Sequence, residues 1–239
     1  MYTKANTIVF ILFLLGLATH AQVLVADLNQ ENEGSFPEKI VVNEEVLAFF
    51  GEDDIGRALF KMDQRSSEPV AIHYINSSDS RGIVWDHQLI NNDLYFITGT
   101  IGCIELHKIN LATNNYLFLG KLAGSPGTWE TGRFTPLGKE VFFTASGNGE
   151  SAQLWKIDTL DQLSMIKEFP SYILPKIQLN FNNKLILGLE SAWPDVYLGE
   201  IWASDGTKEG TQLIMDIKPG RGGYNYRILD YHIFGAYFY

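Results

Sequence analysis

Short apolar runs alternate with clusters of Gly, Asp, Ser and Pro along the chain from residue 22 onward. In many runs two adjacent residues are both apolar, as in Leu59-Phe60 and Leu154-Trp155. Neighbouring residues of a strand point to opposite faces of the sheet, so both faces of these strands need cover. Helical periodicity is weak and confined to stretches such as Leu160 to Lys167. The pattern therefore predicts an all-β protein whose sheets each pack between two others.

The apolar pairs recur at a nearly constant spacing. A Leu or Ile followed by an aromatic residue or His begins at positions 59, 106, 154 and 201, so the steps are 47, 48 and 47 residues. An Asp or Asn follows each pair at the same offset, namely Asp63, Asn110, Asp158 and Asp205. Four short strands per repeat of this length are typical of a β-propeller blade. We expect the second residues of the pairs to be buried between blades: Phe60, His107, Trp155 and Trp202.

The sequence predicts a signal peptide over 1-21, and the repeat register predicts one β-propeller repeat domain over 22-239. Within the domain we expect a lone strand at 22-34, blades at 35-78, 79-124, 125-170 and 171-218, and a partial blade at 219-239. The strand Val23 to Leu28 resembles the last strand of a blade, and Ile233 to Phe238 supplies a strand of an unfinished one. The sequence thus predicts a propeller fragment with about four complete repeats.

Residues 1-21 have the pattern of a secretory signal peptide. Lys4 precedes an apolar core from Ile8 to Leu17, and Thr19-His20-Ala21 forms a cleavage site before Gln22. The core is shorter than the roughly 20 apolar residues that a membrane-spanning helix needs. We therefore expect no membrane span in the mature chain and a secreted, periplasmic or cell-surface location. Cys103 is the only cysteine, so it cannot form an internal disulfide, and we expect it to be a small buried hydrophobe.

Charge and histidine spacing exclude two classes of site. The formal net charge is -10 and no run of Lys or Arg is present, which argues against nucleic acid as a partner. The five histidines have no spacing typical of metal ligands, and Glu52-Asp53-Asp54 lacks the pattern of a calcium loop. We expect no metal and no cofactor. His107 should be a buried, hydrogen-bonded, neutral histidine in the core.

The stretch Glu200-Ile201-Trp202-Ala203-Ser204-Asp205-Gly206-Thr207, with Glu209-Gly210-Thr211 and Asp216-Ile217-Lys218-Pro219-Gly220 after it, resembles the signature of the ELWxxDGT repeat proteins. The three earlier copies keep the Leu-aromatic pair but lose Asp-Gly-Thr. The resemblance implies an exported bacterial propeller, secreted or surface-exposed, and no known chemistry. Read as a hairpin, Asp205-Gly206 predicts a tight turn, because this dipeptide tolerates positive φ angles.

Two groups of residues are candidates for a functional site. Asp86 and His87 lie on the first strand of their unit, which lines the channel of a propeller, although adjacent residues face opposite sides. The second group consists of aromatic residues in loops that share one face: Trp129, Trp193, Tyr197 and Tyr224. Aromatic residues beside Gly and Asp suit sugar or protein surfaces, although they could instead cap blade edges.

The leading hypothesis is an exported binding or interaction module with a carbohydrate or protein ligand at the loop face and no catalysis of its own. One alternative is a polysaccharide-active hydrolase or lyase with its site in the channel, near Asp86 and His87. Another is a purely structural cell-surface repeat protein. A fold alone does not choose between them, and the sequence gives no indication of the oligomeric state or the identity of the ligand.

Overall fold

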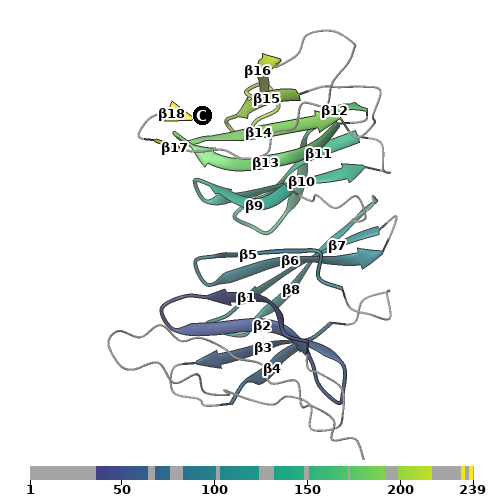
Figure 1. Cartoon of the computed structure of the whole chain (residues 1–239), viewed down its shortest axis with the longest axis vertical. Coiled ribbons are helices and arrows are strands. Elements are labelled where there is room, and N and C mark those ends of the chain that lie inside the picture. Colours follow the sequence, from purple (N-terminus) through teal and green to yellow (C-terminus); the bar gives the residue numbers. More distant parts are fainter. Residues whose placement is uncertain are drawn as a thin grey trace, which may run out of the picture. The chain divides into compact units, whose positions relative to one another are not determined.

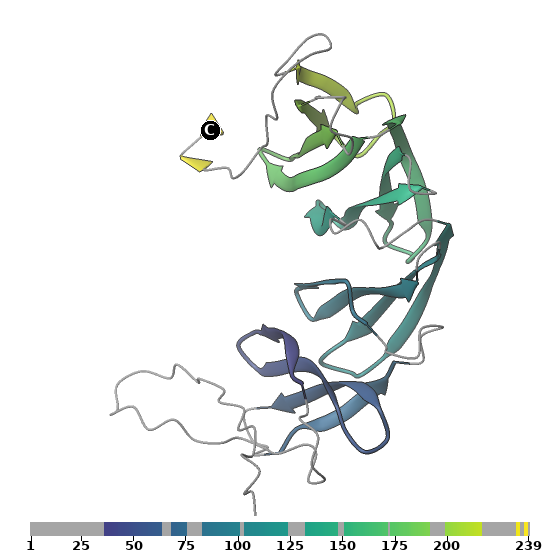
Figure 2. The same cartoon turned by 45° about the vertical axis from the view of Figure 1, so that its right-hand side comes forward.

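The computed structural model describes residues 36–63, 68–75, 83–100, 103–123, 132–147, 151–171, 173–191, 199–216, 233–234 and 237–238. All regular structure in this part of the chain is β-strand. The strands form four sheets of four strands each, and one small two-stranded sheet. In each large sheet the strands follow one another in chain order, as a meander (Figure 1 and Figure 2). This is the topology of a propeller blade.

The strands match the apolar runs of the sequence. The first sheet contains β1 (Glu38–Val42), β2 (Val46–Glu52), β3 (Arg57–Asp63) and β4 (Val70–Tyr74). The second contains β5 (Asp86–Ile90), β6 (Asp93–Thr100), β7 (Cys103–Asn110) and β8 (Tyr116–Ala123). The third contains β9 (Gly132–Leu137), β10 (Glu140–Gly147), β11 (Ser151–Ile157) and β12 (Leu163–Ser171). The fourth contains β13 (Ile173–Phe181), β14 (Lys184–Ser191), β15 (Gly199–Ser204) and β16 (Gln212–Asp216).

The end of the chain differs from the expected pattern. The stretch from Ile233 to Phe238, expected to be one strand, contains two short strands, β17 (Ile233–Phe234) and β18 (Tyr237–Phe238), which pair with each other. Gly235 and Ala236 separate them in the sequence. The lone strand expected at 22-34 lies outside the described residues.

The chain divides into two compact units. One comprises residues 1–84 and 109–116, and the other comprises residues 85–108 and 117–239. The division cuts through β7 and β8, so the turn between these strands groups with the first sheet. In the first unit, Leu47, Phe49 and Ala58 form a core with Phe60 and Met62. The rings of Phe49 and Phe60 stack with their centroids 5.6 Å apart.

The core of the second unit lies between sheets. Tyr95 and Leu106 of the second sheet pack with Phe143 of the third in one cluster. Phe142 belongs to another cluster, together with Leu187 of the fourth sheet. Because Phe142 and Phe143 are consecutive and fully buried, the third sheet buries both of its faces. The prediction of two apolar faces is confirmed here.

The outermost strand of three sheets contains a β-bulge. The pairing shifts register at Leu59/Phe60, Leu154/Trp155 and Ile201/Trp202, which are the apolar pairs that define the repeat. The extra residues opposite these positions are Ile72, Ile166 and Ile214. A bulge disrupts the row of backbone donors and acceptors at a sheet edge and discourages pairing with another chain. The repeat therefore includes a device that protects its outer edge.

The aromatic positions of the repeat are not equally buried. Phe60 and His107 are 3% and 7% exposed, whereas Trp155 and Trp202 are only partly buried. Each indole N–H donates to a side chain two residues earlier, Trp155 to Gln153 Oε1 at 3.1 Å and Trp202 to Glu200 Oε2 at 2.8 Å. The expected burial of both tryptophans is met only in part: each packs against a core cluster but stays partly exposed, which gives its indole N–H a polar partner near the surface.

Candidate functional site

The two ends of each sheet carry different kinds of connection. In a four-stranded meander the connections β1–β2 and β3–β4 lie at one end, and β2–β3 and the link to the next sheet lie at the other. We call these the turn end and the loop end. By strand order, the connections of more than seven residues, 75–85, 124–131 and 217–232, each lead from one sheet to the next and so belong to the loop end. The two seven-residue connections are divided, 192–198 belonging to the loop end and 205–211 to the turn end. Loops at one end of a rigid scaffold are where binding residues usually lie.

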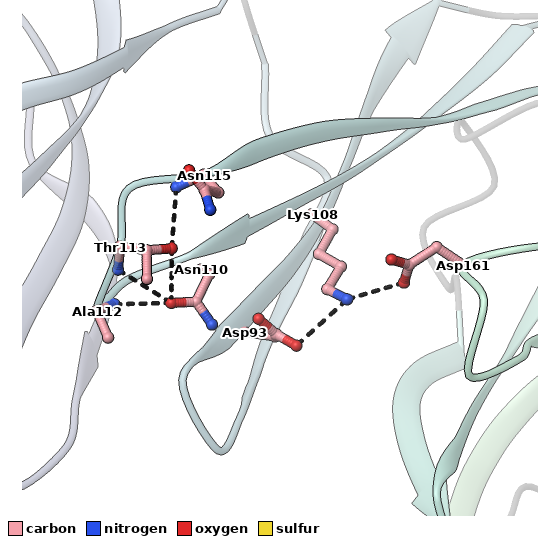
Figure 3. Close-up of polar contacts among 7 residues, drawn as sticks. All are labelled: Asp93, Lys108, Asn110, Ala112, Thr113, Asn115 and Asp161. Atoms are coloured by element: carbon pink, nitrogen blue, oxygen red, sulfur yellow. Dashed lines mark hydrogen bonds and ion pairs between the residues drawn. The ribbon is translucent and has the colours of Figure 1, made fainter.

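The turn end is held by side chains that accept backbone hydrogen bonds. Asn110 Oδ1 accepts the amides of Ala112 and Thr113 at 3.1 and 3.0 Å, and the Thr113 hydroxyl at 3.1 Å (Figure 3). Asp158, one repeat later, accepts the amides of Leu160 and Gln162 at 2.8 and 2.9 Å. These bonds, first that from Gln162, lower the pKa of Asp158 below its ordinary value. The recurring Asp or Asn of the repeat is therefore a turn-capping residue.

The Asp-Gly-Thr motif forms a longer loop than expected. Seven residues, 205–211, separate β15 from β16, so the tight two-residue turn predicted at Asp205-Gly206 is wrong. Asp205 Oδ1 accepts the amide and the hydroxyl of Thr207 at 2.9 and 2.7 Å. Thr207 Oγ1 in turn accepts the amide of Gly210 at 2.9 Å. The side-chain bond from Thr207 is the main cause that lowers the pKa of Asp205.

Both glycines of the motif make close contacts. Gly206 has a φ of +91°, and a Cβ there would lie 2.8 Å from Cζ of Phe142 on β10. A Cβ on Gly210 would overlap the carboxylate of Asp205. The motif loop thus packs against the preceding sheet, and within the loop Gly210 lies directly against the carboxylate of Asp205. In this structure the motif stabilises the junction between two sheets.

A lysine on the third strand links neighbouring elements at the turn end. Lys108 Nζ lies 3.3 Å from Asp93 Oδ2 on β6 and 2.8 Å from Asp161 Oδ1 beyond β11 (Figure 3). Lys61, the equivalent residue of the first sheet, donates to Asn114 Oδ1 at 3.0 Å. Both links to the following repeat span 53 residues. Burial alone would lower the pKa of Lys108, but the bond to Asp161 and the nearby charges raise it. We call this repeated link the lysine clasp.

The expected channel pair lies on β5, at the inner edge of the second sheet. Asp86 Oδ1 accepts the backbone amide of His87 at 2.8 Å, and both residues are partly buried. Their Cα partners on β6 are Ile97 and Phe96, so the two side chains leave opposite faces of the strand. The structure does not bring these two side chains together on one face. The four aromatic candidates, Trp129, Trp193, Tyr197 and Tyr224, lie outside the described residues.

A buried polar network in the second sheet was not anticipated as a unit. Glu105, 5% exposed, pairs with Lys121 Nζ at 2.6 Å through Oε1, and its Oε2 accepts the Thr98 hydroxyl at 3.4 Å. The same hydroxyl lies 2.6 Å from Nε2 of His107, whose ring stacks on Phe96. The prediction that His107 is buried and hydrogen-bonded is confirmed. Glu105 and His107 alternate along β7, which is the sequence signal that places them on one face.

Membrane and metal sites were also sought in the described part of the chain. It contains no helix long and apolar enough to cross a bilayer. Within the same residues, no three His, Cys, Asp or Glu side chains gather in a way that could hold a metal ion.

Comparison with known proteins bears on the fold. No family model matches the sequence, and no curated protein matches it. Solved structures do match: prolyl endopeptidases give a TM-score of 0.50 at 6% identity, over 77% of this chain and 28% of theirs. The β-propeller domain of the Trilobed protease from Pyrococcus furiosus gives 0.47 at 9% identity, over 75% and 57%. TolB from Acinetobacter baumannii gives 0.41 at 17%, over 72% and 41%.

The four large sheets of the described residues have the fold of β-propeller blades. The prediction of an all-β fold with four-stranded propeller blades is confirmed by the four sheets of the described residues, each a meander in chain order. The chain spans 28% of the matched endopeptidase chain and 57% of the matched Pyrococcus domain. At these identities the likeness concerns the fold alone.

Proposed function

We propose that this propeller is an exported binding module that recognises a carbohydrate or protein ligand at its loop end. We also propose that it is related to the ELWxxDGT repeat proteins, whose signature its fourth repeat resembles. One observation carries the proposal. The polar groups of the turn end are used to cap turns and join repeats, whereas the connections of more than seven residues all lead from one sheet to the next and so belong to the loop end. By strand order, the connections that contain the four aromatic candidates all belong to the loop end: Trp129, Trp193, Tyr197 and Tyr224.

The Asp-Gly-Thr motif, which carries the resemblance to the family, supports the same division between a structural turn end and a binding loop end. Asp205, Thr207 and Gly210 bond to one another, and Gly206 packs on Phe142. These residues are engaged in holding two sheets together, so ligand recognition falls to residues elsewhere. Export is supported by the pattern of residues 1-21. Mass spectrometry of secreted protein should find Gln22 at the N-terminus, and recovery of intact Met1 outside the cytoplasm would contradict export by this route.

The test is a binding screen with matched variants. Purified full-length protein is applied to a glycan array and to extracellular proteins, and hits are quantified for three forms. The double variant Trp129→Ala, Trp193→Ala should lose binding with little change in melting temperature, because exposed loop aromatics contribute little to stability. The control Leu160→Ala removes a side chain that is 76% exposed at the turn end, and it should bind as the wild type does.

Three outcomes contradict the proposal. Unfolding of the double variant would show that the tryptophans cap blade edges and act structurally. Full binding by a folded double variant would place the site elsewhere. Turnover of an arrayed polysaccharide, abolished by Asp86→Asn or His87→Gln, would favour the alternative of a channel enzyme.

A further inference from the structure

His73, on the outer strand β4, stacks on Tyr116 at the start of β8. The ring centroids are 3.8 Å apart and the rings are 19° from parallel. Both residues belong to the same compact unit, in which residues 109–116 group with the first sheet. The clasp between Lys61 and Asn114 joins the same two elements. The imidazole is therefore part of the contact that holds the turn between β7 and β8 to the first sheet.

The surroundings of the His73 ring disfavour a positive charge. Its Cα partner on β3 is Leu59, and Arg57 and Lys61 flank Leu59 on the same face of that strand. Arg57 is ion-paired with Glu38, and Lys61 donates to Asn114. The remaining charged group on this face of β3 is Asp63, which is exposed at the end of the strand. On the turn, the titratable group against His73 is the Tyr116 phenol.

We propose that His73 is an acid-sensitive switch that holds the start of β8 against β4 when neutral and releases it when protonated. An imidazolium would lose hydration in this half-buried position, and the side chains that flank its Cα partner on β3, Arg57 and Lys61, supply no negative charge to offset that loss. Attraction between an imidazolium and the Tyr116 ring opposes this, but a cation–π contact is weak at a partly exposed site. The neutral imidazole loses less hydration free energy on burial than the imidazolium does, and it keeps the same stacking contact with Tyr116.

The direction of the pH effect follows from proton linkage. Burial lowers the pKa of His73 below its ordinary value of 6.5. The folded state therefore binds fewer protons than the unfolded state as the pH falls below 6.5. The stabilising contribution is fully present above this pH and is lost progressively toward the folded-state pKa. The contact should loosen in mildly acidic surroundings and tighten again at neutral pH.

Two measurements on the full chain test the switch. A histidine NMR titration should give His73 a pKa below 6.5. Amide hydrogen exchange, corrected for intrinsic rates, should show a several-fold loss of protection at Leu117 and Phe118 between about pH 7.5 and about pH 5. His73→Phe keeps an aromatic ring on Tyr116 and cannot titrate, so it should remove this loss. Amides of β10 and β14 serve as internal controls and should change little.

Either of two results overturns the proposal. A His73 pKa at or above 6.5 would show that the site accepts the charge. An equal acid-dependent loss of protection in His73→Phe would assign the effect to other groups. If His73→Phe does not fold, the wild-type titration decides the matter alone.

Discussion

At the scale of single residues, glycine positions show why the Asp-Gly-Thr motif has its composition. Gly206 and Gly138 both have positive φ angles, +91° and +62°, but only at Gly206 would an added methyl group meet other atoms within 4 Å. A comparison of substitutions at Gly206 and Gly138 therefore separates the cost of backbone strain from the cost of steric overlap. A positive φ costs an L-residue roughly 1–2 kcal/mol, and overpacking a core adds about 1–3 kcal/mol.

We predict that Gly206→Ala destabilises the protein clearly more than Gly138→Ala, because only the former drives a methyl group against Phe142. The difference in unfolding free energy should be about 1–3 kcal/mol. Denaturant titration of both variants measures it. Equal costs would show that the motif loop does not pack on β10 as described.

The carboxylates at the turn end predict an acid response of their own. Backbone bonds from Gln162 and Leu160 lower the pKa of Asp158 below 3.8, so its stabilising effect is present above that pH and is lost as the pH falls through the folded-state pKa. Asp158→Asn keeps the acceptor oxygen, as Asn110 does in the previous repeat. The variant should fold normally and lose part of the decline in stability at strongly acid pH. Thermal melts across this pH range measure the effect. An equal decline in the stability of Asp158→Asn and of the wild type would contradict the prediction.

At the scale of elements, the lysine clasp is a contact between repeats. It can be recognised in the sequence only when the repeats are aligned with one another. Lys61 and Lys108 each reach a residue 53 positions later, and Lys108 also reaches Asp93. The groups are partly exposed, so each pair contributes modestly. A double-mutant cycle with Lys108→Met and Asp161→Asn should give a coupling energy of about 0.5–1 kcal/mol that decreases with salt. The matched pair Lys108→Met and Ser164→Ala should show no coupling.

The strands and loops also show where sequence reasoning stopped. The spacing of apolar pairs predicted the four sheets and the use of both faces, because burial imposes that pattern directly. The bulges at Ile72, Ile166 and Ile214 were not predicted, since an extra residue in a strand leaves the apolar pattern almost unchanged. The seven-residue loop after Ser204 was not predicted, because the expectation of a tight turn rested on the dipeptide Asp205-Gly206 alone. The observed loop depends on hydrogen bonds that also involve Thr207 and Gly210.

At the scale of the whole molecule, the sequence predicted the fold better than the site. A repeat of apolar positions is a strong signal because every copy must solve the same packing problem. Candidate site residues occur once each, on a strand or in loops, and their residue types are compatible with several roles. Asp86 and His87 illustrate this: they are adjacent in sequence, yet the alternation of the strand separates their side chains. The Glu105 network was equally hidden, because its members come from three strands.

The central claim is that the turn end supports the structure while the loop end binds. Hydrogen exchange of the full chain, with and without a ligand identified on the array, tests it most directly. We predict ligand-induced protection in segments 124–131 and 192–198 and none in the turns 110–115, 158–162 and 205–211. Protection confined to those turns, with the loop-end segments unchanged, would contradict the claim.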